Sequence, residues 1–181
     1  MNNLERYFSK EDLEKIRRCD DLYLKAAILV RVLFKDKVDK GGAPYIGHLK
    51  RVSDKMTTLE GKVAALLHDT VEDIEGVTFD DLRDIGIPEE IIEILILVTK
   101  EESEKSLTKE EKLIRYGKEI DRIIESGNQV AIELKISDMT DNYNPERLKL
   151  CSKEQREWLE LKYESQLEKL LNARNPKQFK I

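Results

Sequence analysis

The chain has 181 residues, of which 38% are charged, and it contains only 8 glycines and 4 prolines. This length suits one domain with a well-developed core, and the scarcity of turn-forming residues favours long solvated helices over a sheet-rich fold. The formal net charge of −5 argues against nucleic acid as a partner, because a nucleic-acid backbone requires a basic surface, but a local site can still take a small phosphorylated molecule.

Cap residues, glycines and prolines set the limits of the expected helices. In chain order we expect helices over 9–34, from about His48 onward, and over 58–73, 78–86, 88–100, 108–126, 128–142 and 152–174. A polar segment with two glycines, residues 35–44, separates the first helix from the second. The prediction is an all-α helical bundle forming a single domain over 1–181, with a core over about 22–145 on which the C-terminal helix, about 152–174, packs.

Sequence features also bear on the compartment. Cys19 and Cys151 lack the spacing of a redox or metal motif, so we expect unpaired thiols and a reducing environment. The N-terminus lacks the pattern of a secretory signal, and the longest apolar stretch, residues 91–98, is too short to span a bilayer. We therefore expect a cytoplasmic protein without a membrane partner, and the sequence leaves a homo-oligomer open.

A dense apolar helix ends in a cluster of ionisable residues. Val63 to Leu67 is apolar, and His68, Asp69, Glu72 and Asp73 then follow within one and a half turns. On a helix, residues four apart share a face, so these carboxylates and the imidazole would crowd together. Crowded carboxylates resist burial unless a cation neutralises them, and a metal ion is the simplest neutraliser.

Two further residues extend the set of candidate metal ligands. The chain has two histidines, of which the other is His48, and Asp138 lies on the predicted helix 128–142 four residues before Asn142. Two imidazoles with Asp69 and Asp138 make a mixed nitrogen and oxygen set, which suits Mn, Fe, Zn or Co better than Mg or Ca. Water at such a site becomes a usable nucleophile near neutral pH.

These residues stand in a recognisable order. The segments GAPYIGH (42–48), HDTVED (68–73) and LKISDMTDN (134–142) resemble the HD-domain phosphohydrolases and, more narrowly, the hydrolase domain of the RelA/SpoT family and the stand-alone small alarmone hydrolases. A histidine-aspartate pair alone is a weak signal, whereas the three segments together are distinctive. The resemblance extends from about residue 22 to 142.

The resemblance implies a fold, an activity and a role for each matching residue. It implies an HD-domain hydrolase that removes 3′-pyrophosphate from a guanosine alarmone such as ppGpp, by attack of a metal-bound water. The implied ligands of one Mn²⁺, or of another divalent transition metal, are His48, His68, Asp69 and Asp138. Glu72 and Asp73 would handle protons. The implied substrate contacts are Lys40, Tyr45, Asn142 and Arg147.

Two positions depart from the family pattern and favour an alternative substrate. Asp39 stands where the family usually has an arginine that stacks on guanine, and Asn144 stands where it has another arginine, for which Arg147 could substitute. The alternative is an HD phosphohydrolase acting on another nucleotide, a nucleoside mono- or triphosphate. A third hypothesis is a metal-stabilised module that binds a nucleotide without turnover.

Each candidate residue also has a purely structural interpretation. A lone histidine such as His48 is more often a hydrogen-bonded core residue than a metal ligand. Glu72 and Asp73 could be solvated acids at a helix end, although the helix dipole disfavours acids there. Lys40 could be a surface lysine of the charged loop, and Asn142 could only cap its helix. The combination of residues favours the functional interpretation.

Overall fold

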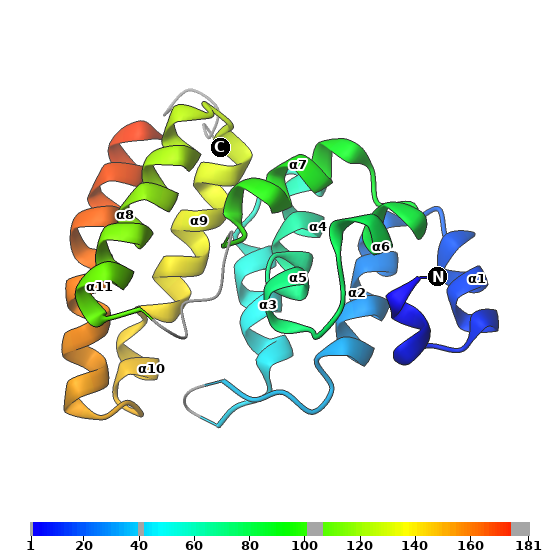
Figure 1. Ribbon diagram of the computed structural model, residues 1–181, viewed down its shortest axis with the longest axis horizontal. Coiled ribbons are helices and arrows are strands. Elements are labelled where there is room, and N and C mark those ends of the chain that lie inside the picture. Colours follow the sequence, from blue (N-terminus) through cyan, green and yellow to red (C-terminus); the bar gives the residue numbers. More distant parts are fainter. Residues whose placement is uncertain (1, 40–41, 101–106, 175–181) are drawn as a thin grey trace. The chain divides into compact units, whose positions relative to one another are not determined.

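The computed structural model describes residues 2–39, 42–100 and 107–174 (Figure 1). These residues form helices and one isolated antiparallel bridge between Val38 and Pro44, with no extended strand among them. The all-α prediction is confirmed. The chain divides into two compact units, Met1–Thr99 and Lys100–Ile181, and the prediction of a single domain over 1–181 stays a prediction.

The first unit is built around one buried helix. Its elements are η1 (Asn3–Arg6), α1 (Lys10–Arg17), α2 (Leu22–Leu33), α3 (Tyr45–Asp54), α4 (Leu59–Leu67), α5 (Thr70–Asp73), α6 (Phe79–Asp84) and α7 (Glu89–Val98). Helices α2, α3 and α7 pack against α4, and every residue from Val63 to Leu67 is buried. Ala64 and Ala65 let neighbouring helices approach closely. This packing fixes the end of α4, where His68 follows.

Two of the predicted helices are broken. The expected helix 9–34 is α1 and α2, and the expected helix 58–73 is α4 and α5. Asp21 causes the first break, since its carboxylate accepts a hydrogen bond from the Leu24 N–H at 3.0 Å and caps a new helix. Because the apolar spacing continues across Asp21, the sequence pattern does not reveal that one helix ends and another begins there. The second break falls at His68 and Asp69, between the apolar helix and the acids.

A buried lysine joins α1, α2 and α6. The Lys25 side chain, on α2, is 3% exposed, and its Nζ donates hydrogen bonds to the carbonyl oxygens of Ile85 at 2.9 Å and of Arg17 and Gly86 at 3.4 Å. These carbonyls follow or end helices and lack helical partners. Gly86 has a φ of +85°, which suits glycine. The lysine thereby anchors the ends of α1 and α6 against the core.

The second unit contains α8 (Lys109–Glu125), α9 (Gln129–Asn142), α10 (Pro145–Leu148) and α11 (Lys153–Ala173). In this unit, α9 runs in the opposite direction to α8 and α11 (Figure 1). Helix α11 packs on α8 and α9, which run beside it in Figure 1. Thr108 and Ser152 each close a capping box at the start of α8 and α11, as their sequences predict.

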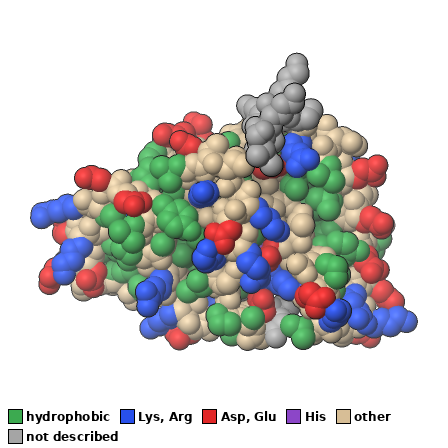
Figure 2. All heavy atoms as spheres, turned by 180° about the vertical axis from the view of Figure 1, so that it is seen from behind, with side chains coloured by type: hydrophobic (Ala, Val, Ile, Leu, Met, Phe, Trp, Pro, Cys, Tyr) green, Lys and Arg blue, Asp and Glu red, His purple; other side chains and the backbone are tan. Residues whose placement is uncertain are grey.

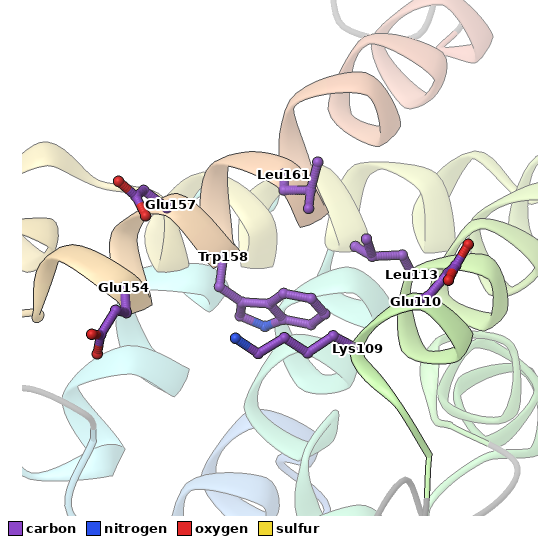
Figure 3. Close-up of a pocket in the computed structure, with 7 residues that line it drawn as sticks. All are labelled: Lys109, Glu110, Leu113, Glu154, Glu157, Trp158 and Leu161. Atoms are coloured by element: carbon purple, nitrogen blue, oxygen red, sulfur yellow. The ribbon is translucent and has the colours of Figure 1, made fainter.

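Part of the apolar side of α11 is exposed. Leu170 is fully buried, but Leu161 and Leu171 are 64% and 43% exposed. Trp158 is half-buried and lies in an open groove between the beginnings of α8 and α11 (Figure 3). The groove is lined by Lys109, Glu110, Leu113, Glu154, Glu157, Trp158 and Leu161.

The surface carries charges of both signs. On the face shown in Figure 2, lysine and arginine side chains lie interspersed with aspartate and glutamate. Both cysteines are free thiols, as expected. Over residues 2–39, 42–100 and 107–174, no helix is both long enough and apolar enough to cross a bilayer.

An aspartate at the start of α6 holds the N-terminal turn. The Asp81 side chain accepts hydrogen bonds from the backbone N–H and Nδ2 of Asn3, at 2.7 and 3.0 Å, and from the N–H and hydroxyl of Thr78, at 2.9 and 2.7 Å. Burial alone would raise the pKa of this carboxyl group, but the hydrogen bonds from Asn3 and Thr78 outweigh it and hold the pKa below its ordinary value. The ionised carboxylate therefore stabilises the folded state.

The Asp81 interaction predicts a pH dependence of stability. Because the folded-state pKa is depressed, the stabilisation is fully present above the unfolded pKa of about 4 and is lost as the pH falls through the folded value. We expect Asp81→Asn to lower the free energy of unfolding at pH 7 by about 2 kcal/mol and to flatten its decline in acid, measured by urea denaturation from pH 7 to 3. The control is Asp80→Asn, an exposed neighbour, and equal acid profiles for the two variants would contradict the assignment.

Candidate metal centre

Three predicted residues of the first unit come together in space. His48 lies on α3, and His68 and Asp69 form the turn between α4 and α5. One ligand atom from each lies within 4.8 Å of the others, and the two imidazole centroids are 5.5 Å apart. The histidines are 1% and 5% exposed. Helix α3 and the turn after α4 thus bring two buried imidazoles and a partly buried carboxylate together.

The His68 ring is held in one tautomer. Its Nδ1 lies 2.8 Å from the carbonyl oxygen of Ala65, one turn earlier. A carbonyl can only accept, so Nδ1 carries the proton, and in the neutral ring Nε2 presents a lone pair. That Nε2 lies 3.1 Å from Oδ2 of Asp69. A lone pair and a carboxylate oxygen repel at this distance unless a proton or a cation lies between them.

Three groups converge on one oxygen of Asp69. Besides the His68 contact, Nε2 of His48 lies 3.8 Å from Oδ2, and the Tyr45 hydroxyl donates to it at 2.7 Å. Ligand atoms about 2.1 Å from one transition metal, at a tetrahedral angle, are roughly 3.4 Å apart. The spacing of the two imidazoles and the carboxylate therefore fits a divalent transition metal, and these three side chains can hold one.

Tyr45 has a role that its position in the sequence does not reveal. Its ring stacks on Phe34, with centroids 5.4 Å apart and planes at 11°, and it meets the edge of His48. Its hydroxyl then orients the Asp69 carboxylate. Residues that orient metal ligands in this way tune affinity without touching the metal.

The two predicted proton-handling acids lie on α5, directly after the cluster. Glu72 is exposed, and the Asp73 side chain is 32% exposed. Burial raises the pKa of the Asp73 carboxyl group, the charge of Asp69 raises it further, and a hydrogen bond from Lys37 opposes both. The pKa of Asp73 is raised overall from its ordinary value, as suits a carboxylate that accepts a proton during a reaction.

The remaining candidates of the first unit lie in the loop before α3. Lys40 falls outside the described residues. Asp39, at the position that departs from the family pattern, accepts a hydrogen bond from the Ala43 N–H at 3.0 Å, and its own N–H donates to the Ala43 carbonyl at 2.8 Å. Asp39 is therefore held to Ala43 by two hydrogen bonds, one of them to its carboxylate.

The candidates of the second unit form a polar network along α9. Asn142 Nδ2 donates to Oδ1 of Asp138 at 2.6 Å, as the four-residue spacing predicts, and Lys135 Nζ lies 3.5 Å from Oδ2. Asp138 is 8% exposed. Arg147 reaches back from α10 to pair with Asp141 and lies 3.5 Å from the Asn142 side-chain oxygen. The structure thus groups Asp138, Asn142 and Arg147 within the second unit.

Sequence reasoning missed two lysines. Lys135 lies three residues before Asp138, a helical spacing that could have indicated the pair. Lys37 contacts Asp73, which is 36 residues distant in the chain, and no local pattern signals such a contact.

Comparison with known proteins supports the fold. A solved structure of a metazoan ortholog of SpoT, described as hydrolysing ppGpp and acting in starvation responses, matches this chain with a TM-score of 0.63. The match covers 85% of this chain and 96% of that one, at 22% sequence identity. The chain shares the fold of a ppGpp hydrolase. The expected HD-domain fold is confirmed, although no protein-family model and no curated protein sequence matches the chain.

The Tyr45 hydroxyl predicts a measurable effect on metal affinity. We expect Tyr45→Phe to weaken Mn²⁺ or Co²⁺ binding about tenfold in titration calorimetry, because the ring still stacks but Asp69 loses its orienting hydrogen bond. Tyr7→Phe is the matched control, since the Tyr7 hydroxyl donates to the Glu75 carbonyl outside the cluster.

His68→Ala should abolish stoichiometric metal binding, and retention of wild-type affinity in that variant would refute the site.

Proposed function

We propose that the protein is a metal-dependent phosphohydrolase of the HD type. The observation that carries the proposal is the convergence of His48 and His68 on one oxygen of Asp69, in a buried site followed directly by two acids. This arrangement combines a cation site with groups able to exchange protons. The fold shared with a ppGpp hydrolase supports the same activity class.

We propose Asp138 as the fourth ligand of one Mn²⁺, with His48, His68 and Asp69. In support, the Asp138 carboxylate is nearly buried and is oriented by Asn142 and Lys135, as a ligating carboxylate requires. A mixed nitrogen and oxygen donor set suits manganese or another divalent transition metal. Such a cation, when bound, lowers the pKa of water at the site and offsets the charge that develops on a phosphate.

Glu72 and Asp73 are the proposed proton-handling residues. As water attacks the phosphorus of the 3′-linked pyrophosphate, a new O–P bond forms and the bond from phosphorus to the 3′ oxygen breaks. One acid takes the proton from the attacking water, and the leaving 3′ oxygen receives a proton to become a hydroxyl. From ppGpp the products are GDP and pyrophosphate.

The proposed substrate is a guanosine alarmone of the ppGpp type. Lys40, Asn142 and Arg147 are the proposed contacts for its phosphates and ribose, and Tyr45 lines the same site. Arg147 could supply the cation that Asn144 does not, and the 3.5 Å approach to Asn142 places its guanidinium beside another proposed contact.

A second candidate substrate is another nucleotide. Asp39 favours it, because the Asp39 carboxylate is engaged with Ala43 in closing the loop and cannot stack on guanine as an arginine does. Turnover of a nucleoside mono- or triphosphate in preference to ppGpp would establish this alternative. A non-catalytic nucleotide-binding module would instead bind without turnover.

The experiment is a hydrolysis assay with Mn²⁺ and a nucleotide panel that includes ppGpp. We expect pyrophosphate release from ppGpp, and we expect Glu72→Gln and Asp73→Asn to reduce kcat about 100-fold or more while metal stoichiometry is unchanged. Glu75→Gln is the matched control, because Glu75 is an exposed acid just beyond α5. Full activity in both acid variants would contradict the proposed roles, and no turnover by the wild type on any nucleotide would favour the binding module.

The ligand role of Asp138 has its own test. We expect Asp138→Asn to weaken Mn²⁺ binding at least tenfold, because a neutral amide is a poorer ligand than a carboxylate. Asp121→Asn is the control, since Asp121 pairs with Lys169 between α8 and α11 and is not among the proposed ligands. Equal affinities for Mn²⁺ in the two variants would exclude Asp138 from the ligand set.

A further inference from the structure

Lys37 contacts Asp73, the second of the two proposed proton-handling acids. Its Nζ donates a hydrogen bond to the backbone carbonyl of Asp73 at 2.5 Å and lies 3.1 Å from Oδ2 of the Asp73 carboxylate. One ammonium group thus holds both the backbone and the side chain of the same residue. We propose that Lys37 is a positioning residue that fixes the direction of the Asp73 carboxylate, an inference that rests on the proposed hydrolase function.

The lysine is itself anchored next to the metal cluster. Its N–H donates to the Phe34 carbonyl at 3.1 Å, its carbonyl accepts from the Tyr45 N–H at 3.0 Å, and the next residue forms the bridge to Pro44. Its Nζ also lies 5.6 Å from the centroid of the Phe34 ring. Because Phe34 stacks on Tyr45, Lys37 belongs to the same rigid group that orients Asp69.

Asp73 needs such a partner for two physical reasons. It ends α5, a helix of four residues, so little regular structure holds its backbone. It also carries a negative charge beside those of Asp69 and Glu72, which raise its pKa. A cation at 3.1 Å offsets this repulsion and selects one orientation of the carboxylate.

Lys37 acts through Asp73 in this proposal and does not touch the reacting atoms. The proton still passes from water to a carboxylate, and the lysine only donates hydrogen bonds. Its side chain is 38% exposed, so its position is determined by the backbone contacts of the loop and by Asp73 rather than by burial. Orientation of a proton-accepting group affects kcat more than substrate binding.

The test is a double-mutant cycle on turnover with Mn²⁺ and the nucleotide that the wild type hydrolyses. We expect Lys37→Met to lower kcat about tenfold with KM and metal stoichiometry unchanged, and Lys37→Arg to restore most of the loss. Lys35→Met is the matched control, since Lys35 is an exposed lysine two residues earlier that lies 3.8 Å from Asp36. In an Asp73→Asn background, Lys37→Met should cause no further loss.

Several outcomes would overturn the proposal. An unchanged kcat in Lys37→Met, a loss confined to KM, or an independent tenfold loss in the Asp73→Asn background would each show that Lys37 does not act through Asp73. Failure of the hydrolase proposal is distinguishable, because it would appear as a wild type without turnover. The contact is then tested by urea denaturation of the same four proteins: non-additive shifts of the midpoint support it, and additive shifts refute it.

Discussion

The site depends on one electrostatic requirement, the need to neutralise the Asp69 carboxylate. The Ala65 carbonyl fixes the His68 tautomer, so a lone pair rather than an N–H faces Asp69 at 3.1 Å. The Tyr45 hydroxyl satisfies part of the carboxylate but leaves its charge. A cation between the imidazoles and the carboxylate resolves the conflict, whereas a protonated His68 resolves it with a buried charge pair and offers no chemistry.

The packing of the first unit makes this requirement possible. Helix α4 is buried along its length from Val63, and it stops where His68 begins the turn. Helices α2, α3 and α7 pack on α4 and thereby hold that turn in place. A helix that continued through Asp73, as the apolar spacing suggested, would have presented the acids differently. The break allows α5 to carry Glu72 and Asp73 as a separate element.

Much of this arrangement was predictable because its signals are local in the sequence. Thr58 and Thr78 cap their helices as expected, and Asp138 bonds to Asn142 as their spacing predicts. The proximity of His48 to His68 was predictable from the resemblance to a known family, because no local sequence pattern links the two residues. The break at Asp21 was missed because the apolar period continues through it. The contact of Lys37 with Asp73 was missed because only tertiary structure brings residues 36 positions apart together.

Two lysines lie beside carboxylates that we propose to be functional. Lys37 beside Asp73 and Lys135 beside Asp138 each place an ammonium within 3.5 Å of a carboxylate that the proposed reaction uses. Neither ammonium removes the charge, and both restrict where the carboxylate points. Asp39, by contrast, is held by its own loop. In each unit, a carboxylate proposed to be functional is thus oriented by a cation from the same unit.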